Sequence, residues 1–208
     1  MARRSKSSGR WLREHFSDPF VQRAQSEGWR SRAVFKLEEI DQRERLLRPG
    51  DRCVDLGAAP GAWSQYARLK VGASGHVLAS DILPMDTLAG VEFIQGDFRE
   101  EAVLAALLER LPDGQADVLL SDMAPNLSGM DAIDQPRSMH LSELALDLAT
   151  QVLKPRGRAL IKTFQGAGFQ ELIQAARGRF AKVKLVKPAA SRSRSPEVYL
   201  LAMDFLLV

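Results

Sequence analysis

The stretch that decides the fold runs from Val54 to Trp63 and reads VDLGAAPGAW. An apolar segment carries an acid near its end, a turn of small residues follows, and a helix-like segment begins after the turn. Glycine has no Cβ, so a turn of this kind lets a ligand lie almost against the backbone. The stretch therefore indicates a strand, a turn and a helix that together bind a nucleotide-like cofactor.

Length and composition limit the class of protein. With 208 residues, 45% of them hydrophobic and 26% charged, the chain suits one globular domain with extensions. It has no run of about 18 apolar residues, and its basic N-terminus lacks the apolar core of a signal peptide, so we expect no membrane partner. Cys53 is the single cysteine and cannot form an internal disulfide, and no spacing of cysteines and histidines suggests zinc. We expect a cytoplasmic protein that binds no metal.

The charges are unevenly distributed along the chain. Residues 1–50 carry a net charge of +5, residues 51–155 carry −9 and residues 156–208 carry +7, for a total of +3. The two basic ends could meet on one face of the fold and bind a polyanion through its phosphates. A solvated surface accounts for such charge runs equally well, so the pattern leaves both interpretations open.

Strand-like and helix-like patterns alternate from residue 51 onwards. The alternation predicts right-handed crossovers between parallel strands, hence an α/β, Rossmann-like fold with helices on both faces of the sheet. Helices are expected at 101–111 and 139–153, the second ending before the sequence KPRG at 154–157. The last two strands lack a helix between them, so we expect them to pair antiparallel at one edge. The seven expected strands cover residues 52–56, 76–80, 92–95, 117–121, 159–163, 183–186 and 198–205.

The chain is expected to consist of a domain with one extension. Residues 51–208 carry the alternating pattern and form the domain. Residues 1–50 form a basic helical extension ahead of it, and we expect about the first ten of them to lack fixed structure.

Acidic residues follow three of the expected strands, and a lysine ends a fourth. The acids are Asp81, Asp97 and Asp122, and the lysine is Lys162. A single acid after a strand is most simply a helix N-cap. Ligands of open α/β sheets bind beyond the carboxyl ends of the strands, however, so the four residues together predict a binding site there.

The turn distinguishes between two kinds of cofactor. A dinucleotide favours Gly-x-Gly-x-x-Gly, whose helix N-terminus receives a pyrophosphate. The present turn matches that motif poorly, and Pro60 removes a backbone N–H that a phosphate would need. S-adenosylmethionine carries no phosphate, and acids after the second and third strands can accept hydrogen bonds from its ribose hydroxyls and its adenine amino group. We therefore favour S-adenosylmethionine and a methyltransferase over a nicotinamide-dependent dehydrogenase.

Asp122 and Lys162 end the two strands next to the cofactor turn, and we expect both to face the reacting methyl group. Burial, or a second ammonium group nearby, favours the neutral form of a lysine, which can then act as a base near neutral pH. A hydroxyl acceptor needs such help, whereas an electron-rich ring nitrogen often does not. The alternative is that Lys162 is an ordinary surface charge at a strand end.

Four motifs in the chain are found together in one protein family. They read DLGAAPGAWSQ at 55–65, SDMAPN at 121–126, KTFQG at 162–166 and SRSRSPE at 191–197. In this combination the chain resembles the FtsJ/RrmJ family, which comprises S-adenosylmethionine-dependent ribose 2′-O-methyltransferases of RNA. The likeness extends from Trp11 to Tyr199 and is strongest to bacterial members that methylate a uridine of large-subunit ribosomal RNA.

The resemblance implies roles for individual residues. The catalytic set of the family, Lys-Asp-Lys-Glu, falls here on Lys36, Asp122, Lys162 and Glu197. Lys162 would be the base that takes the 2′-hydroxyl proton. The cofactor contacts of the family fall on Gly61, Trp63, Asp81, Asp97 and Asp122. Without the resemblance, Trp63 is most simply a core aromatic, and Lys36 and Glu197 carry no signal of function.

One position departs from the family pattern. Ala62 stands where close relatives usually carry glycine. Its methyl group could crowd the cofactor slightly, but alanine also favours the start of a helix, so the departure changes the expected site little.

The expected substrate is RNA. Arginines among serines just before a strand suggest a phosphate-binding loop, and basic residues near the N-terminus could add to it, so we expect RNA contacts at Arg30, Arg32, Arg192 and Arg194. The resemblance implies 2′-O-methylation of a uridine in 23S ribosomal RNA, in the assembled 50S subunit, by a monomer. Methylation of transfer RNA stays open as an alternative, as does a non-catalytic role as an RNA-binding ribosome assembly factor.

Overall fold

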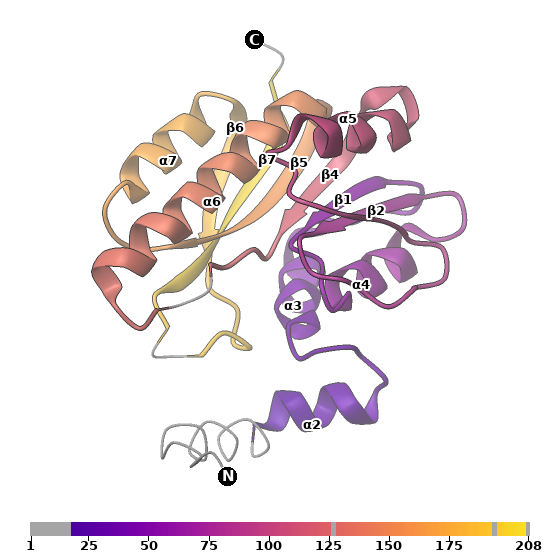
Figure 1. Ribbon diagram of the computed structural model, residues 1–208, viewed down its shortest axis with the longest axis horizontal. Helices are drawn as coiled ribbons and strands as arrows, with labels where there is room; N and C mark the ends of the chain where they lie inside the picture. Colours follow the sequence, from indigo (N-terminus) through magenta and orange to yellow (C-terminus); the bar gives the residue numbers. More distant parts are fainter. Residues whose placement is uncertain (1–17, 126–127, 193–194, 207–208) are drawn as a thin grey trace.

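The computed structural model describes residues 18–125, 128–192 and 195–206 (Figure 1). Seven strands form one sheet in the order β3-β2-β1-β4-β5-β7-β6. Strands β1 to β5 are parallel, and β7 runs antiparallel to both of its neighbours. The strands are β1 (Arg52–Leu56), β2 (His76–Asp81), β3 (Glu92–Gln95), β4 (Ala116–Ser121), β5 (Leu153–Phe164), β6 (Phe180–Val186) and β7 (Glu197–Phe205).

This topology confirms the expected α/β, Rossmann-like fold. The chain winds outward from β1 through β2 to β3, returns to place β4 beside β1, and continues to β5. The expected antiparallel pairing of the last two strands is also confirmed, with β7 between β5 and β6, so that β6 is the outermost strand. The winding reverses between β1 and β4, which is the position where open α/β sheets bind ligands.

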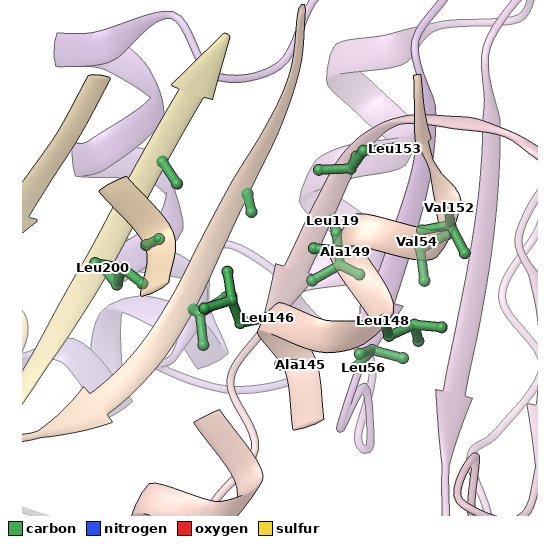
Figure 2. Packing of buried hydrophobic residues seen from close by; sticks show 14 of the residues in the cluster. Val54, Leu56, Leu119, Ala145, Leu146, Leu148, Ala149, Val152, Leu153 and Leu200 are labelled. Atoms are coloured by element: carbon green, nitrogen blue, oxygen red, sulfur yellow. The ribbon is translucent and has the colours of Figure 1, made fainter. Parts of the chain in front are cut away.

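Helices cover both faces of the sheet, and each face has its own hydrophobic cluster. Val54 and Leu56 of β1 belong to the cluster under α5, α6 and α7, whereas Cys53 belongs to the cluster under α3 and α4. Figure 2 shows residues of α6 packed near Val54, Leu56 and Leu119 of the sheet. Because both faces are buried at the centre of the sheet, the inner strands, such as β4, are largely apolar without alternation. The helices are α2 (Pro19–Ser26), α3 (Val34–Glu44), α4 (Ala62–Val71), α5 (Glu101–Arg110), α6 (Asp131–Val152) and α7 (Phe169–Arg177), with a short 3₁₀ turn η1 (Pro112–Gly114).

Helix α6 begins well before residue 139, where the helix was expected to start. Its first two turns are polar and include Pro136, which has no N–H for an intrahelical hydrogen bond, so the sequence carries no helical signal there. Asp134 stabilises this end instead, because its carboxylate accepts hydrogen bonds from the backbone N–H groups of Ser128 and Gly129 at 2.8 and 2.9 Å. The expected stop is confirmed: α6 ends at Val152 and β5 follows directly.

Helix α3 lies in the part of the chain that was expected to be an extension. It buries Val34, Leu37 and Ile40 in the same cluster as Trp63 of α4 and Leu160 of β5. The helix therefore belongs to the hydrophobic core of the domain. The first ten residues, which were expected to lack fixed structure, lie outside the described residues.

Candidate active site

A cavity of about 520 Å³ opens at the carboxyl ends of β1 to β4, beside the first half of α6. The strand register explains why residues far apart in the sequence meet there. Leu56 pairs with Ser80 on one side and with Ser121 on the other, so Asp81 and Asp122 leave the sheet at the same level. Asp81, Asp97 and Asp122 all line the cavity, as does Gly57 of the turn. The three acids that follow strands in the sequence are thus brought together.

The turn between β1 and α4 brings the backbone close to the cavity. Gly57 has φ of 70°, and a Cβ at this residue would lie 2.6 Å from Cγ of Met123. The N–H of Gly57 donates to the carbonyl of Ser80 at 2.9 Å, and the N–H of Ala59 donates to Oδ2 of Asp81 at 2.9 Å. The Ala59–Pro60 peptide bond is cis. A side chain at residue 57 would be strained and would displace Met123, so this turn requires glycine there.

The carboxylates of Asp81 and Asp97, which both line the cavity, have different hydrogen-bond partners. Oδ1 of Asp81 accepts from the N–H of Leu83 at 2.8 Å and Oδ2 accepts from Ala59, so each oxygen keeps a lone pair for a ligand hydroxyl. Asp97 is paired with Arg99, whose Nε donates to both carboxylate oxygens at 2.9 Å. These hydrogen bonds and the charge of Arg99 hold the pKa of Asp97 below its ordinary value. Asp97 is therefore an ionised acceptor at neutral pH.

Four charged side chains from four parts of the chain form one connected group. Nζ of Lys162 lies 2.9 Å from Oδ1 of Asp122 and 3.8 Å from Oε2 of Glu197. Nζ of Lys36 lies 2.7 Å from Oε1 of Glu197. The side chains of Lys162 and Glu197 are only 8% and 10% exposed, so their charges are largely removed from water. The structure thus brings together all four residues of the expected catalytic set.

The strands and α3 place these four side chains. Lys162 of β5 lies opposite Tyr199 of β7, and Glu197 lies two residues earlier on β7, so the three share one face of the sheet. Helix α3 packs on that face and carries Lys36 to Glu197. Asp122 directly follows β4 and receives a hydrogen bond from Nζ of Lys162 at its backbone carbonyl as well, at 2.8 Å.

Burial and charge act in opposite directions on Asp122. Burial raises its pKa, but the positive charges of Lys162 and Lys36 and the hydrogen bonds from Tyr199 and Lys162 outweigh burial and hold the pKa below its ordinary value. The hydroxyl of Tyr199 donates to Oδ1 of Asp122 at 2.6 Å. Burial, together with the negative charges of Asp122 and Glu197, raises the pKa of Tyr199 well above its ordinary value. At neutral pH Asp122 is therefore a carboxylate and Tyr199 a neutral donor.

Gly61 and Trp63 lie at the start of α4. Gly61 is the N-cap, with φ of 105°. The side chain of Trp63 is buried: its Nε1 donates to the carbonyl of Ala33 at 2.8 Å and its ring lies 5.7 Å from that of Tyr199. Trp63 contributes to a small hollow of about 30 Å³ that Asp122 also lines, but not to the larger cavity. Its indole is thus a core aromatic directly behind the turn between β1 and α4.

Asp55 lies beneath the turn and is completely buried. Oγ of Ser64 donates to its Oδ2 at 2.6 Å, and its Oδ1 has no hydrogen-bond partner among the described residues. Burial raises the pKa of Asp55 to about 7; the hydrogen bond from Ser64 opposes this rise, and the charges of Asp122 and Asp81 add to it. The carboxyl group therefore changes its protonation state near neutral pH.

The arginines expected to contact RNA differ in their surroundings. Nη2 of Arg32 donates to the carbonyl of Ala190 at 2.6 Å, and its Nε lies 3.2 Å from Oδ2 of Asp18. Arg30 donates to three backbone carbonyls. Arg192 is half-buried in the loop before β7, and Arg194 lies outside the described residues. The guanidinium groups of Arg30 and Arg32 are thus directed at the protein itself.

Two residues of the site were missed from the sequence. They are Tyr199, which binds Asp122, and Ser191, whose Oγ donates to Oε1 of Glu197 at 2.8 Å. Tyr199 had a usable signal, because residues two apart in a strand share a face and Glu197 was already a candidate. Ser191 had none, because a serine in a serine-rich loop does not indicate its partner.

The acids of the site are not grouped as metal ligands would be. In the part of the chain that the structure describes, no cluster of three or more His, Cys, Asp or Glu side chains could hold a metal ion. Within the same residues, no helix combines the length and the apolar character needed to cross a bilayer.

The fold and the acids at the strand ends define the chain as a Rossmann-like methyltransferase, and comparisons with known proteins support this class. A curated relative named ribosomal RNA large subunit methyltransferase E, from Xanthomonas euvesicatoria pv. vesicatoria (strain 85-10), is 62% identical over 201 residues, which cover 97% of this chain and 96% of the relative. A relative of the same name from Legionella pneumophila (strain Corby) is 59% identical over 204 residues, which cover 98% and 99%. A crystal structure described as a ribosomal RNA methyltransferase of Plasmodium falciparum matches with a TM-score of 0.72 at 28% identity, over 86% of this chain and 99% of that one.

The family can be stated more narrowly. The model of the FtsJ-like methyltransferase family matches residues 29–205, and the chain belongs to this family. The match confirms the resemblance inferred from the four motifs. It begins ahead of Lys36, so the segment before the sheet is included in the family's domain.

Proposed function

We propose that the protein transfers a methyl group from S-adenosylmethionine to the ribose 2′-hydroxyl of a uridine in 23S ribosomal RNA, in the assembled 50S subunit. The observation that carries this proposal is the buried group formed by Lys162, Asp122 and Glu197 beside the cavity. A hydroxyl acceptor needs a base, and Lys162 is a buried amine that Asp122 and Glu197 hold in place beside the cavity. The names of the relatives support large-subunit ribosomal RNA as the substrate.

The residues around the cavity fit S-adenosylmethionine. The turn offers a close backbone approach at Gly57, and the cavity of about 520 Å³ is of the size that small-molecule sites have. Asp81 would accept hydrogen bonds from the ribose hydroxyls and Asp97 from the adenine amino group. Gly61 would contact the methionine end through its backbone groups, and Trp63 would support the turn from the core. When bound, the cofactor supplies a methyl group on a sulfonium, which is already a strong electrophile.

Lys162 would act as the base. Nζ of Lys162 would take the proton of the 2′-hydroxyl as the ribose oxygen receives the methyl group that the bound cofactor would supply. Asp122 and Glu197 would hold Nζ of Lys162 in place and would balance the charge of the ammonium that forms, and Lys36 would in turn hold Glu197. Alignment of the ribose oxygen with the methyl group would provide the rest of the rate enhancement.

The RNA would be held mainly through its backbone. Structured RNA is recognised through charge and shape, and an enzyme that modifies one nucleotide turns it out of the helix into the site. Arg192 and Arg194 in the loop before β7 would contact phosphates close to Glu197. We further propose that the protein acts as a monomer in the cytoplasm.

The lysine variant Lys162→Ala tests the proposal. We expect calorimetry to show unchanged affinity for S-adenosylmethionine, because Lys162 does not line the cavity. Methyl transfer is measured on 50S subunits from a strain that lacks the protein. Its rate should fall by at least about a hundredfold, as expected for the loss of a general base. Mass spectrometry of the RNA should place the wild-type methyl group on the ribose of a uridine. Substantial residual transfer by the variant would rule out Lys162 as the base.

A matched control is available on the same strand. Lys154 lies at the opposite end of β5 and pairs with Asp117, so Lys154→Ala removes a lysine far from the cavity and should leave transfer intact. The same assay separates the alternatives. Transfer to bulk transfer RNA instead of 50S subunits would identify a transfer RNA enzyme, and RNA binding without any transfer would identify an assembly factor.

A further inference from the structure

Arg30 connects two walls of the cavity through its guanidinium group. It lies between α2 and α3 and is half-buried. Its Nη1 donates to the carbonyls of Pro60 at 3.0 Å and of Asp86 at 2.7 Å, and its Nη2 donates to the carbonyl of Thr87 at 2.8 Å. The guanidinium of Arg30 thus donates to the carbonyl groups of three residues. The planar group of arginine has separate N–H donors for such an arrangement, whereas the compact ammonium of lysine cannot reproduce it.

The two segments that Arg30 connects both belong to the cavity. Pro60 is part of the turn whose residues Gly57 and Ala59 line it. Asp86 and Thr87 lie in the loop 82–90, which follows Asp81 and whose first two residues, Ile82 and Leu83, also line it. Most residues of this loop are exposed. Its other contacts include the carbonyl of Ile82, which accepts from Nε2 of Gln95 at 3.4 Å, and Sδ of Met85, which lies beside Gly61 of the turn. The hydrogen bonds of Arg30 to both segments therefore help to fix the position of the loop relative to the turn.

The backbone around Arg30 is fixed as well. The N–H of Arg30 donates to Oε1 of Gln65 at 3.2 Å, and Nε2 of the same glutamine donates to the carbonyl of Gly28 at 3.0 Å. Gly61 leaves the space that the guanidinium needs, since a Cβ there would lie 2.8 Å from Nη1 of Arg30. Helix α4, the turn and the segment before α3 are thus built around this one side chain.

We propose that Arg30 is a positioning residue of the cofactor site and not a contact to RNA. By holding the turn at Pro60 and the loop 82–90 at a fixed separation, it keeps Asp81 and the backbone of the turn in place for a ligand between them. The inference rests on the proposed use of S-adenosylmethionine. It replaces the expectation, based on charge alone, that Arg30 binds phosphate.

Calorimetry with S-adenosylmethionine tests this proposal on Arg30→Ala and Arg30→Lys. We expect the dissociation constant to rise about ten- to a hundredfold in the alanine variant, as for the loss of one or two hydrogen bonds from a charged donor. The lysine variant should recover only part of the lost affinity for S-adenosylmethionine. At saturating cofactor the rate of methyl transfer should be close to that of the wild type, so that KM for the cofactor changes and kcat does not. Arg43→Ala is the matched control, because Arg43 is exposed on α3 and forms an ion pair with Glu39 at 3.8 Å.

The dependence of RNA affinity on salt separates the two possible roles of Arg30. A phosphate contact lowers the slope of log affinity against log salt by about one when it is lost. We expect Arg30→Ala to keep the wild-type slope. Unchanged cofactor affinity in both Arg30 variants, or a reduced slope with unchanged cofactor affinity, would overturn the inference. If Arg30→Ala does not fold, Arg30→Lys keeps the charge and the aliphatic stem and decides the question alone. A wild-type protein that binds no S-adenosylmethionine would instead refute the proposed function.

Discussion

Replacing Asp55 by asparagine should make the stability of the protein less dependent on pH. Burial raises the pKa of Asp55 from its ordinary value of 3.8 to about 7. A carboxyl group with a raised pKa binds its proton more tightly in the folded than in the unfolded state. Below about pH 4 both states hold the proton and the group costs nothing. Between about pH 4 and 7 the unfolded state releases the proton while the folded state keeps it, so the folded state loses relative stability as the pH rises, until the cost becomes constant above pH 7.

The size of the effect follows from the two pKa values. The full cost above pH 7 is about 4 kcal/mol, of which about 2.5 kcal/mol develops between pH 5 and pH 8. Asparagine has nearly the same shape, can accept the hydrogen bond from Ser64, and does not titrate. Titrating groups that do not interact with Asp55 contribute equally to both proteins, so the difference between wild type and Asp55→Asn reports on this carboxyl group and its coupling to Asp122 and Asp81.

Urea unfolding at a series of pH values measures this difference. We expect the free energy of unfolding of the wild type, relative to that of Asp55→Asn, to fall by about 2.5 kcal/mol from pH 5 to pH 8. Ser64→Ala removes the hydrogen bond that lowers the pKa of Asp55, so it should shift the fall to higher pH. A difference that is constant within about 0.5 kcal/mol over this range would refute the reasoning, because it would mean that Asp55 ionises in the folded state as easily as in the unfolded chain.

Two further predictions concern the cofactor site and the core. Asp81→Ala should weaken S-adenosylmethionine binding at least about tenfold in calorimetry, because it removes the expected acceptor for the ribose and the acceptor for the N–H of Ala59. Asp86→Ala is the control: it changes an exposed side chain in the neighbouring loop and should leave binding unchanged. Leu56→Ala should lower the free energy of unfolding, measured with urea, by about 2–5 kcal/mol, because Leu56 is fully buried between the sheet and α6. Leu69 is exposed, so Leu69→Ala should change the free energy of unfolding by less than about 0.5 kcal/mol. Equal effects of the two leucine variants would contradict this view of the core.

The strands could be predicted from the sequence because their signals are local. Strands β1 to β4 are short runs that end at, or are followed by, glycine or aspartate, and Arg52–Leu56 and Glu92–Gln95 coincide with the expected ranges. The start of α6 could not be predicted, because its first turns are polar and are stabilised by the contacts of Asp134 with residues 128 and 129 rather than by an apolar face. Its apolar part, which packs on β1 and β4, was predicted.

The site could be predicted only in part, for a physical reason. Asp81, Asp97, Asp122 and Lys162 follow strands, and parallel strands place their carboxyl ends together, so topology alone predicted their meeting. The contact between Lys36 and Glu197 joins residues far apart in the chain across one face of the sheet, and no local pattern encodes it; the family resemblance supplied it. For the arginines, a local signal exists but does not identify the partner. Charge predicted their attraction to phosphate, but carbonyl groups of the protein compete for the same donors, as Arg30 and Arg32 demonstrate.

The segment before the sheet contributes side chains to the candidate site. The alternation of strands and helices begins at residue 51, and this suggested a boundary between an extension and a domain. Lys36 and Arg30 lie before that boundary, and one reaches Glu197 of the last strand while the other holds the turn of the first crossover. Helix α3 also shares its hydrophobic cluster with β5 and β7, the strands that carry Lys162 and Glu197. A change in how α3 packs would thus move Lys36 relative to Lys162 and Arg30 relative to the cavity together, which would couple the two sides of the candidate site.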